Sequence, residues 1–534
     1  MKEGFRQSMA WLHTWSGLLV GWVLFMVFAC GTASYFRDEI TLWMKPELHR
    51  ASHTVVDQGV ATAQIQKLLE QRAAHSPRWF ITLPNEREPS VRASWAPPPS
   101  KQEGKPRGRR RFENASVDPV TGEELNAARA TRGGDFFYRM HFDMHYMPVL
   151  WARWIVGACA MFMLVAIISG IVTHKRIFKD FFTFRPNKGQ RSWLDAHNAT
   201  AVLALPYHLM ITYTGLVTLM FMYLPQGLSA VYPERDAFYA DLNGGPKAEA
   251  KASGVHAPLT QLAPLVAQAS QQWNGAPVGR IAVSLAGDSN ATVTVTQQEG
   301  GGLNSSLPTL TFDGVTGKLL TEADKSGAAV ETRGVMVGLH IGRFASPLLR
   351  GLFFLSGLAG CAMVATGVLL WAVKERPKHL KARANGRIGF GLRLVDGLNL
   401  GGIAGLLIAM SVFFWANRLL PVGLQGRPDL EIQCFFTAWG IAALLALAFP
   451  ARWMWRIQLA VAGLLFALLP IVNPLTGGSG LFASMAQGLW PVAGFDLVSL
   501  LLGCTFLWAS KRLGTVKSSA KAPAKVKTEK EVAA

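Results

Sequence analysis

The chain has 534 residues, of which half are hydrophobic and only 16% are charged. It is too apolar and too long for one ordinary soluble domain. The net charge of +19 would suit a nucleic-acid-binding protein, but the basic residues are concentrated in loops between apolar segments. The composition therefore predicts a membrane protein and argues against nucleic acid as a partner.

Eight apolar segments reach or approach the roughly 20 residues that a membrane-spanning helix needs. They predict an α-helical integral membrane bundle of about eight transmembrane helices, and the seventh segment is the shortest. The segments are residues 12–36, 148–173, 199–224, 345–373, 396–417, 432–450, 457–473 and 488–510.

Lys and Arg alternate along the chain from loop to loop. They are frequent in residues 174–193 and 374–393 and after Lys511, whereas residues 473–488 contain none. Cytoplasmic loops of membrane proteins carry an excess of Lys and Arg. The pattern predicts a multi-pass protein of the bacterial inner (cytoplasmic) membrane with both termini cytoplasmic, and a basic tail close to membrane lipid.

The first apolar segment follows Lys2 and Arg6, as a cleaved signal peptide would. Its apolar run of about 24 residues is long for that role. Cleavage would also remove His13, which has a partner in the repeat described below. We therefore expect this segment to remain as the first transmembrane helix.

Two long polar insertions separate the first four apolar segments. Each insertion begins with a helical pattern (ATAQIQKLLEQ or LTQLAPLVAQASQQW) and continues with alternating strand-like stretches such as RWFITL and GRIAVSL. Each then reaches a D-x-x-T-G turn, DPVTG or DGVTG. We expect two periplasmic α+β domains, one in each insertion.

The predicted organisation is thus a repeat of helix, α+β domain and helix, followed by a separate extension. Its parts are a first transmembrane helix (1–36), a first α+β domain (37–147), two transmembrane helices with a cytoplasmic loop (148–224), a second α+β domain (225–340), a fourth transmembrane helix (341–373), a basic cytoplasmic loop (374–394), a C-terminal four-helix extension (395–510) and a basic disordered tail (511–534).

Four histidines follow the repeat. His145 and His340 each stand 27 residues after the Asp of a D-x-x-T-G turn, and His13 and His197 each stand where an apolar run begins. An ionisable residue in a membrane span is costly and usually functional. Parallel repeats commonly pack about an axis along the membrane normal. We therefore expect His13 to face His197 on the cytoplasmic side and His145 to face His340 on the outer side.

Two further histidines break the symmetry. His208 lies 11 residues after His197, three helical turns along the same face. It could ligate an iron in place of one of the four, or hydrogen-bond a haem or a quinone. His141 lies one turn before His145, and its counterpart in the second repeat is Met336. It could contact a haem propionate, bind a surface metal, or be the true ligand.

Paired imidazoles suit haem iron, since two of them fill both axial positions and favour electron transfer over oxygen binding. Facing helices of a bundle commonly supply such ligands. The chain has no C-x-x-C-H motif for covalent haem attachment, and its five cysteines lie in or beside apolar runs. A lone histidine could equally hydrogen-bond a neighbouring helix, so the repeated placement is what favours ligation of haem iron through His13, His197, His145 and His340.

Several motifs resemble those of the PepSY-associated transmembrane family, also called iron-regulated membrane proteins. They are LHTWSGLL, MHFDMHYMP, LDAHNATAVLALPYHLMITYTG, GLHIGRF and the two D-x-x-T-G turns, and the resemblance covers about residues 1–375. It implies two periplasmic PepSY domains on a four-helix core. In characterised members, that core carries b-type haem and passes electrons outward to reduce ferric siderophores.

The resemblance and the histidines together predict a protein with two b haems that reduces a periplasmic ferric siderophore or other ferric chelate. Periplasmic iron-binding proteins are further candidate partners. The basic segment KQEGKPRGRRR (101–111) could attract an anionic chelate, or could be a solvated loop. No G-x-G-x-x-G unit or cytoplasmic loop offers a nicotinamide or flavin site. The quinol pool or a separate cytoplasmic reductase is therefore the expected electron donor.

Three alternatives remain open at this point. The chain could be a non-enzymatic PepSY regulator of a periplasmic peptidase, an electron conduit to another periplasmic acceptor, or a transporter. The third alternative is disfavoured because Arg418, Glu431 and Asp496 of the extension lie near predicted helix ends.

Overall fold

The structure is a computed structural model of the whole chain. It describes residues 3–50, 57–74, 76–85, 87–97, 112–125, 128–174, 183–234, 236–238, 251–300, 302–322, 327–382 and 388–515. The basic segment 101–111 and most of the basic tail lie outside the described residues.

The predicted bundle of about eight transmembrane helices is confirmed. Seven helical segments are long and apolar enough to cross a membrane, and a bent helix pair makes an eighth among the described residues. In chain order the spans are α1 (Glu3–Ser34), α5 (Val149–Thr173), α7 (Gln190–Leu203) with α8 (Leu205–Thr218), α14 (Pro347–Ala382), α15 (Phe390–Leu400) with η2 (Gly401–Gly405) and α16 (Leu406–Leu419), α17 (Arg427–Ala448), α18 (Arg452–Leu475) and α20 (Trp490–Thr515).

The third span is broken at Ala204, where α7 and α8 meet at an angle of 67°. Pro206 stands in the first turn of α8. A proline lacks the backbone N–H donor and clashes with the preceding helical turn, so it starts a helix more easily than it continues one. The bend therefore has a local cause in the sequence.

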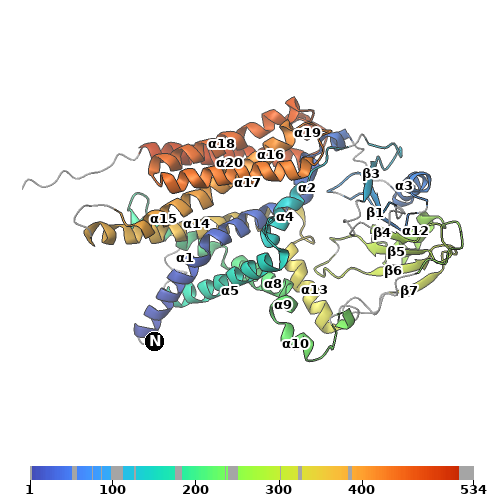
Figure 1. Cartoon of the computed structure of the whole chain (residues 1–534), viewed down its shortest axis with the longest axis horizontal. Coiled ribbons are helices and arrows are strands. Elements are labelled where there is room, and N and C mark those ends of the chain that lie inside the picture. Colours follow the sequence, from blue (N-terminus) through green and yellow to red (C-terminus); the bar gives the residue numbers. More distant parts are fainter. Residues whose placement is uncertain are drawn as a thin grey trace, which may run out of the picture.

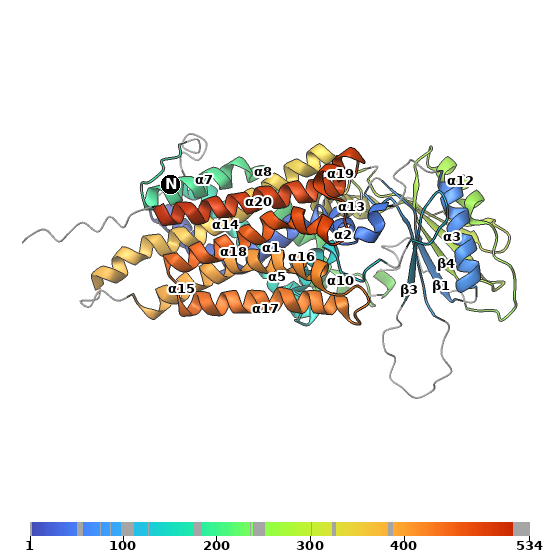
Figure 2. The same ribbon diagram turned by 90° about the horizontal axis from the view of Figure 1, so that it is seen from above.

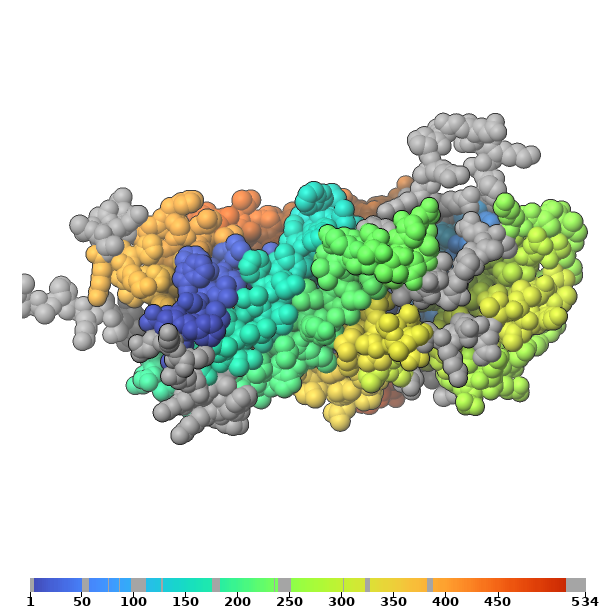
Figure 3. All heavy atoms as spheres, turned by 90° about the horizontal axis from the view of Figure 1, so that it is seen from below, coloured from blue at the N-terminus to red at the C-terminus, as the bar shows by residue number. Residues whose placement is uncertain are grey.

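The spans run along the long axis of the molecule, and the β-sheet lies beyond one end of them (Figures 1 and 2). We call this the sheet end of the bundle. Helix α1 begins and α20 finishes at the opposite end, which we call the terminal end (Figure 1). Helices α1, α5, α8 and α13 lie together on one face of the molecule (Figure 3).

The two insertions form one continuous antiparallel sheet rather than two separate domains. Its strand order is β3-β2-β1-β4-β5-β6-β7, and β1 of the first insertion pairs directly with β4 of the second. The strands are β1 (Arg78–Thr82), β2 (Val91–Trp95), β3 (Glu113–Val117), β4 (Val278–Ser284), β5 (Thr292–Gln297), β6 (Thr309–Asp313) and β7 (Leu319–Glu322).

One hydrophobic core serves both insertions. Helices α3 (Gln58–Arg72) and α12 (Leu262–Gln272) contact each other and cover the face of the sheet remote from the bundle (Figure 2). Ile81 of β1 lies opposite Ile281 of β4 in register, and both side chains are fully buried in this shared core. Each insertion thus contributes its own helix and strands, as the sequence patterns indicate, and the two α+β units share one sheet and one core.

Both D-x-x-T-G turns form as expected. The Asp118 carboxylate accepts hydrogen bonds from the backbone N–H groups two and three residues later, and Gly122 takes a φ of +71°. The Asp313 carboxylate accepts the same two hydrogen bonds, and Gly317 takes a φ of +73°. Glycine adopts this left-handed conformation without the steric cost of a side chain.

Two short helices between the sheet and the spans were not foreseen as separate elements. Helix α4 (Gly134–Asp143) packs on α1, and α13 (Ala328–Ile341) packs on α8, both at the sheet end. The remaining short helices are α2 (Arg37–Trp43), η1 (Pro46–Arg50), α9 (Met220–Tyr223), α10 (Pro225–Ser229) and α19 (Leu481–Ala486).

Buried polar contacts tie the C-terminal extension to the core at the sheet end. Glu431 of α17 forms a fully buried ion pair with Arg427 and accepts a hydrogen bond of 2.5 Å from the Thr131 hydroxyl. The indole of Trp43 donates to the carboxylate of buried Asp496 on α20 over 2.8 Å. These contacts join the extension to the core bundle at the sheet end.

The shared core makes a testable prediction for the sheet. Ile281→Ala should cost about 2–5 kcal/mol, because it leaves a cavity in a fully buried site. Limited proteolysis of the full chain should then cut both insertions sooner, since they unfold as one unit. The control is Leu320→Ala on β7, whose side chain is 53% exposed. Faster cleavage of the second insertion alone would contradict a common core.

Candidate functional site

Four histidines meet as two pairs inside the core bundle. The ring centres of His13 on α1 and His197 on α7 are 6.2 Å apart. Those of His141 on α4 and His340 on α13 are 6.0 Å apart. We call these the inner pair and the outer pair, at the terminal end and the sheet end respectively.

The spacing within each pair suits two imidazoles on opposite sides of one metal ion. A bond from a metal to an imidazole nitrogen is about 2 Å long, and the ring centre lies roughly 1 Å behind that nitrogen, so two such rings have centres about 6 Å apart. A pair of histidines in direct hydrogen-bonded contact would not require this separation. Among the described residues no cluster of three or more His, Cys, Asp or Glu could hold a bare metal ion.

Each of the four rings is anchored in the same way. The Nδ1 atom lies within hydrogen-bond distance of a backbone carbonyl oxygen, to which an Nδ1–H group can donate. This arrangement fixes the tautomer and leaves Nε2 free, as in most metal-bound histidines. The contacts are His13 to Ala166 (2.8 Å), His197 to Met363 (2.9 Å), His141 to Val27 (2.7 Å) and His340 to Ile211 (3.1 Å).

A glycine accompanies every anchor. It stands four residues after the accepting carbonyl, one helical turn further on, where the histidine ring lies against the helix backbone. An added Cβ atom would lie 3.1 Å from the His13 ring at Gly170, 3.1 Å from the His197 ring at Gly367, 2.7 Å from the His141 ring at Gly31 and 2.8 Å from the His340 ring at Gly215. The missing side chain is therefore what lets each imidazole reach its carbonyl.

The anchors repeat along the chain with nearly constant offsets. His13 and His197 are 184 residues apart, and so are Gly31 and Gly215. The second part of each half keeps its order too, because Gly170 follows His141 by 29 residues and Gly367 follows His340 by 27 residues. The two halves of the core thus carry the same histidine–glycine unit.

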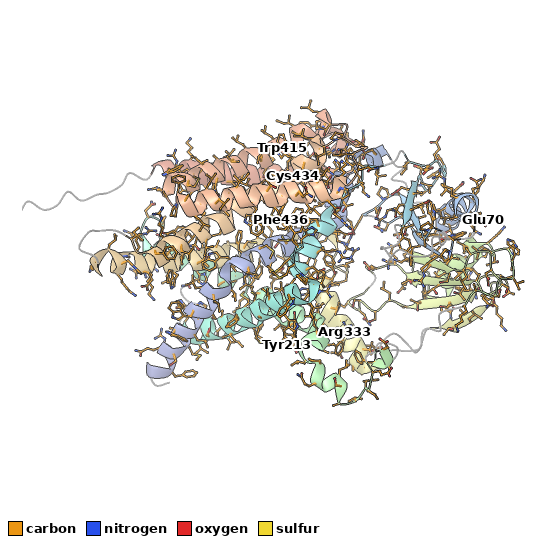
Figure 4. The ribbon with its side chains drawn as sticks, in the orientation of Figure 1. Glu70, Tyr213, Arg333, Trp415, Cys434 and Phe436 are labelled. Atoms are coloured by element: carbon orange, nitrogen blue, oxygen red, sulfur yellow. The ribbon has the colours of Figure 1, made fainter. Side chains whose placement is uncertain are left out.

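The expectation that His145 faces His340 is wrong, because His141 takes that place. Helix α4 ends at Asp143, and both Met144 and His145 adopt left-handed φ values, of 50° and 54°. The ring of His145 consequently stacks on Phe436 of α17 in the extension, with 5.8 Å between ring centres. Figure 4 labels Phe436. Equal spacing from the two D-x-x-T-G turns was misleading, since α13 is four residues longer than α4.

His208 is fully buried in α8 and belongs to neither pair. Its ring lies edge-on to Phe28 with 6.0 Å between ring centres, and next to Gly360 of α14. Within the described part of the chain, neither ring nitrogen makes a well-aligned hydrogen bond, although backbone groups of Ser356 and Ala201 lie close by. The position along α8 is between the levels of the inner and outer pairs.

A cavity of about 290 Å³ adjoins the outer pair. His141 and His340 line it together with Tyr35 and Tyr207, whose hydroxyl groups are 3.0 Å apart. Burial lowers the pKa of His141 and lowers that of His340 to about 3. Both imidazoles are therefore neutral at physiological pH, with the Nε2 lone pair available to a ligand. The tyrosines and the four glycine contacts were missed from the sequence, where only the glycine spacing offered a signal.

Three tryptophans of the two insertions occupy structural positions. Trp43 is fully buried between Phe414 and Phe495, and Trp95 is buried in the core of the sheet. Trp273 packs at the edge of that same core. None of the three lies at a histidine pair.

The bundle and its histidine pairs define a multi-pass helical membrane protein with a duplicated core. The family model described as PepSY-associated TM region matches residues 10–374, so the chain belongs to this family. The match ends before α15, and the extension lies outside it. An uncharacterized protein of Pseudomonas aeruginosa is 26% identical over 381 residues, covering 66% of this chain and 89% of the relative.

The glycine contacts predict a difference between two substitutions of the same kind. Gly215→Ala should destabilise the protein by about 1–3 kcal/mol, because the new methyl group would collide with the His340 ring. Gly17→Ala on α1 meets nothing within 4 Å and should be neutral or stabilising, since alanine favours helix. Thermal unfolding in detergent, followed by tryptophan fluorescence, measures both. Equal melting temperatures for the two variants would contradict the close approach.

Proposed function

We propose that this protein is a transmembrane electron carrier that binds two b-type haems and reduces a ferric chelate. The observation that carries the proposal is the pair of histidine pairs, each with about 6 Å between ring centres and with Nδ1 engaged by a carbonyl. Two imidazole rings with free Nε2 atoms and this distance between their centres could supply both nitrogen ligands of one haem iron.

In this proposal the inner pair, His13 and His197, would hold one haem, and the outer pair, His141 and His340, would hold the other. A haem with two imidazole ligands supplies one-electron oxidation and reduction without ready oxygen binding. The chain's own part is to fix the ring orientation through the carbonyl anchors. It also keeps the imidazoles neutral and surrounds them with apolar helices.

The depth of the two pairs supports transfer across the membrane. His13 and Gly31, which touches the outer pair, are 18 residues apart on α1. At about 1.5 Å per residue this is roughly 27 Å, close to the about 30 Å of a hydrocarbon core. A carrier at each of these levels would place the entry and exit points of the electrons near opposite faces of the membrane.

Charge supports an orientation with the sheet end outside the cytoplasm. Described basic residues occur near most helix ends at the terminal end of the bundle, whereas the loop of residues 473–488 at the sheet end contains no Lys or Arg. Those at the terminal end include Arg6, Arg191, Lys378, Arg393, Arg452 and Arg512. Short loops that are rich in Lys and Arg are expected on the cytoplasmic side of the bacterial inner membrane. Electrons would then pass from the inner pair to the outer pair and on to the periplasm.

A ferric siderophore or other ferric chelate is the acceptor we favour. Membership of a family of iron-regulated membrane proteins supports it. The oxygen ligands of such a chelate bind Fe²⁺ more weakly than Fe³⁺, so reduction would free the metal for uptake. The donor in this scheme is the quinol pool or a cytoplasmic reductase.

Haem analysis of single-histidine variants tests the ligand assignment. Pyridine haemochrome quantification of the pure full chain should give two b haems, with a Soret band that shifts on adding dithionite. His141→Ala should retain about one haem, because one axial bond of the outer site is lost. His145→Ala is the matched control and should retain two.

The proposal fails if the wild-type protein shows no dithionite-sensitive Soret band. Loss of haem from His145→Ala together with full retention in His141→Ala would overturn the outer pairing specifically. The same comparison at the inner site uses His13→Ala and His197→Ala, each of which should keep about one haem.

Electron delivery can be counted directly. Protein reduced with dithionite, freed of excess reductant and mixed anaerobically with ferric citrate should yield two Fe²⁺ per chain, trapped by ferrozine. Each reduced site gives one electron, so His340→Ala should yield about one. A wild-type yield near zero, with the haems remaining reduced, would contradict ferric chelate as the acceptor.

A further inference from the structure

The extension leaves a large groove against the core bundle. Helix α20 contacts α2 at the sheet end, and η2 and α15 contact α1 and α14 deeper in the bundle. Between these two levels lies a cavity of about 1450 Å³ lined by α1, α14, α16, α18 and α20. We call it the interbundle groove. It exceeds the roughly 300–1,000 Å³ of common small-molecule pockets.

The walls of the groove are apolar and combine small and bulky side chains. The core side presents Ala362 and Ala365 of α14 together with the bulky Phe354. The extension side presents bulky residues, such as Met410 and Phe466. The alanines of α14 leave space between the packed helices.

The groove is at least as deep as one leaflet of a bilayer. Its apolar lining runs over 11 residue steps on α14, from Phe354 to Ala365, and over 16 residue steps on α20, from Trp490 to Phe506. At about 1.5 Å per residue these are roughly 16 Å and 24 Å. Half of a hydrocarbon core is about 15 Å.

The mouth of the groove is polar and carries excess positive charge. Six arginines and four carboxylates line it, and the arginines come from both the sheet and the helices: Arg37, Arg87, Arg92, Arg280, Arg343 and Arg350. Arg350 is only 8% exposed and forms an ion pair of 2.6 Å with Glu39, which is 6% exposed. Arg343 pairs with Glu299 over 2.9 Å. The six arginines therefore exceed the four carboxylates of the mouth by two positive charges.

We propose that the interbundle groove is a binding site for one anionic diacyl phospholipid of the leaflet at the sheet end. The arginines at the mouth would hold its phosphate, since basic side chains at the membrane surface attract anionic lipids. The acyl chains would lie between the alanines of α14 and the bulky side chains of α16 and α18. An uncharged quinol would leave the excess positive charge without a counterion.

This inference does not rest on the redox proposal. The apolar part of the groove lies on the far side of α1 from the histidine pairs, and no histidine lines it among the described residues. Three arginines of its mouth, Arg37, Arg87 and Arg343, also line the cavity beside the outer pair, whereas Arg280 lines the groove alone. Much of its wall belongs to the extension, outside the segment that matches the family.

Native mass spectrometry of the delipidated full chain in neutral detergent tests the site. Added palmitoyl-oleoyl phosphatidylglycerol should give one tightly bound lipid, at least tenfold tighter than the phosphatidylcholine of the same chains. Ala365→Phe should weaken this binding at least tenfold by filling the groove. Leu355→Phe, on the 62% exposed outer face of α14, is the matched control and should bind as the wild type does.

Two further variants separate the headgroup from the chains. Arg280→Gln should reduce the preference for phosphatidylglycerol over phosphatidylcholine, and Leu407→Trp on the opposite wall should repeat the loss seen with Ala365→Phe. Equal affinity for both lipids, or unchanged binding in both filling variants, would overturn the proposal. So would displacement of the bound lipid by an equimolar short-chain quinone. Haem content should be the same in all these variants.

Discussion

The arrangement of the core depends on one contact, the approach of an imidazole Nδ1 to a backbone carbonyl beside a helix glycine. A carbonyl inside a helix is already engaged by the N–H group four residues later, so only an unobstructed flank lets a second donor reach it. Glycine at that next turn removes the obstruction at Gly31, Gly170, Gly215 and Gly367. The contact gives the buried Nδ1–H group a hydrogen-bond partner, without which its burial would be costly. It also fixes the direction in which Nε2 points.

The histidine–carbonyl contact occurs in both halves of the duplicated core, but the two halves are not identical. Both halves of the core present the same histidine–glycine unit, and their association brings the rings together from opposite sides. His208 has no such companion, because Leu24 occupies the corresponding position of the first half. Thr214 adds a hydroxyl 3.2 Å from Nδ1 of His340. The two halves are thus alike in the groups that fix the rings and differ in the groups around them.

The sequence was sufficient for features that depend on local pattern. Apolar length located the spans, alternation located β1, β2, β4 and β5, and the position of His13 and His197 at the start of apolar runs predicted their meeting. It was insufficient where distant segments decide the outcome. The choice between His141 and His145 depends on where α4 ends, and the pairing of β1 with β4 joins residues about 200 positions apart. No periodicity within either insertion indicates that its edge strand has a partner in the other.

The junction of β1 and β4 has a consequence for how the chain matures. Phe80 pairs with Ala282, and two membrane spans lie between them in the sequence. The first strand is therefore synthesised well before its neighbour exists, and in the meantime its free edge can bind other chains. The ribosome must complete both of these spans before the nascent protein can close that edge.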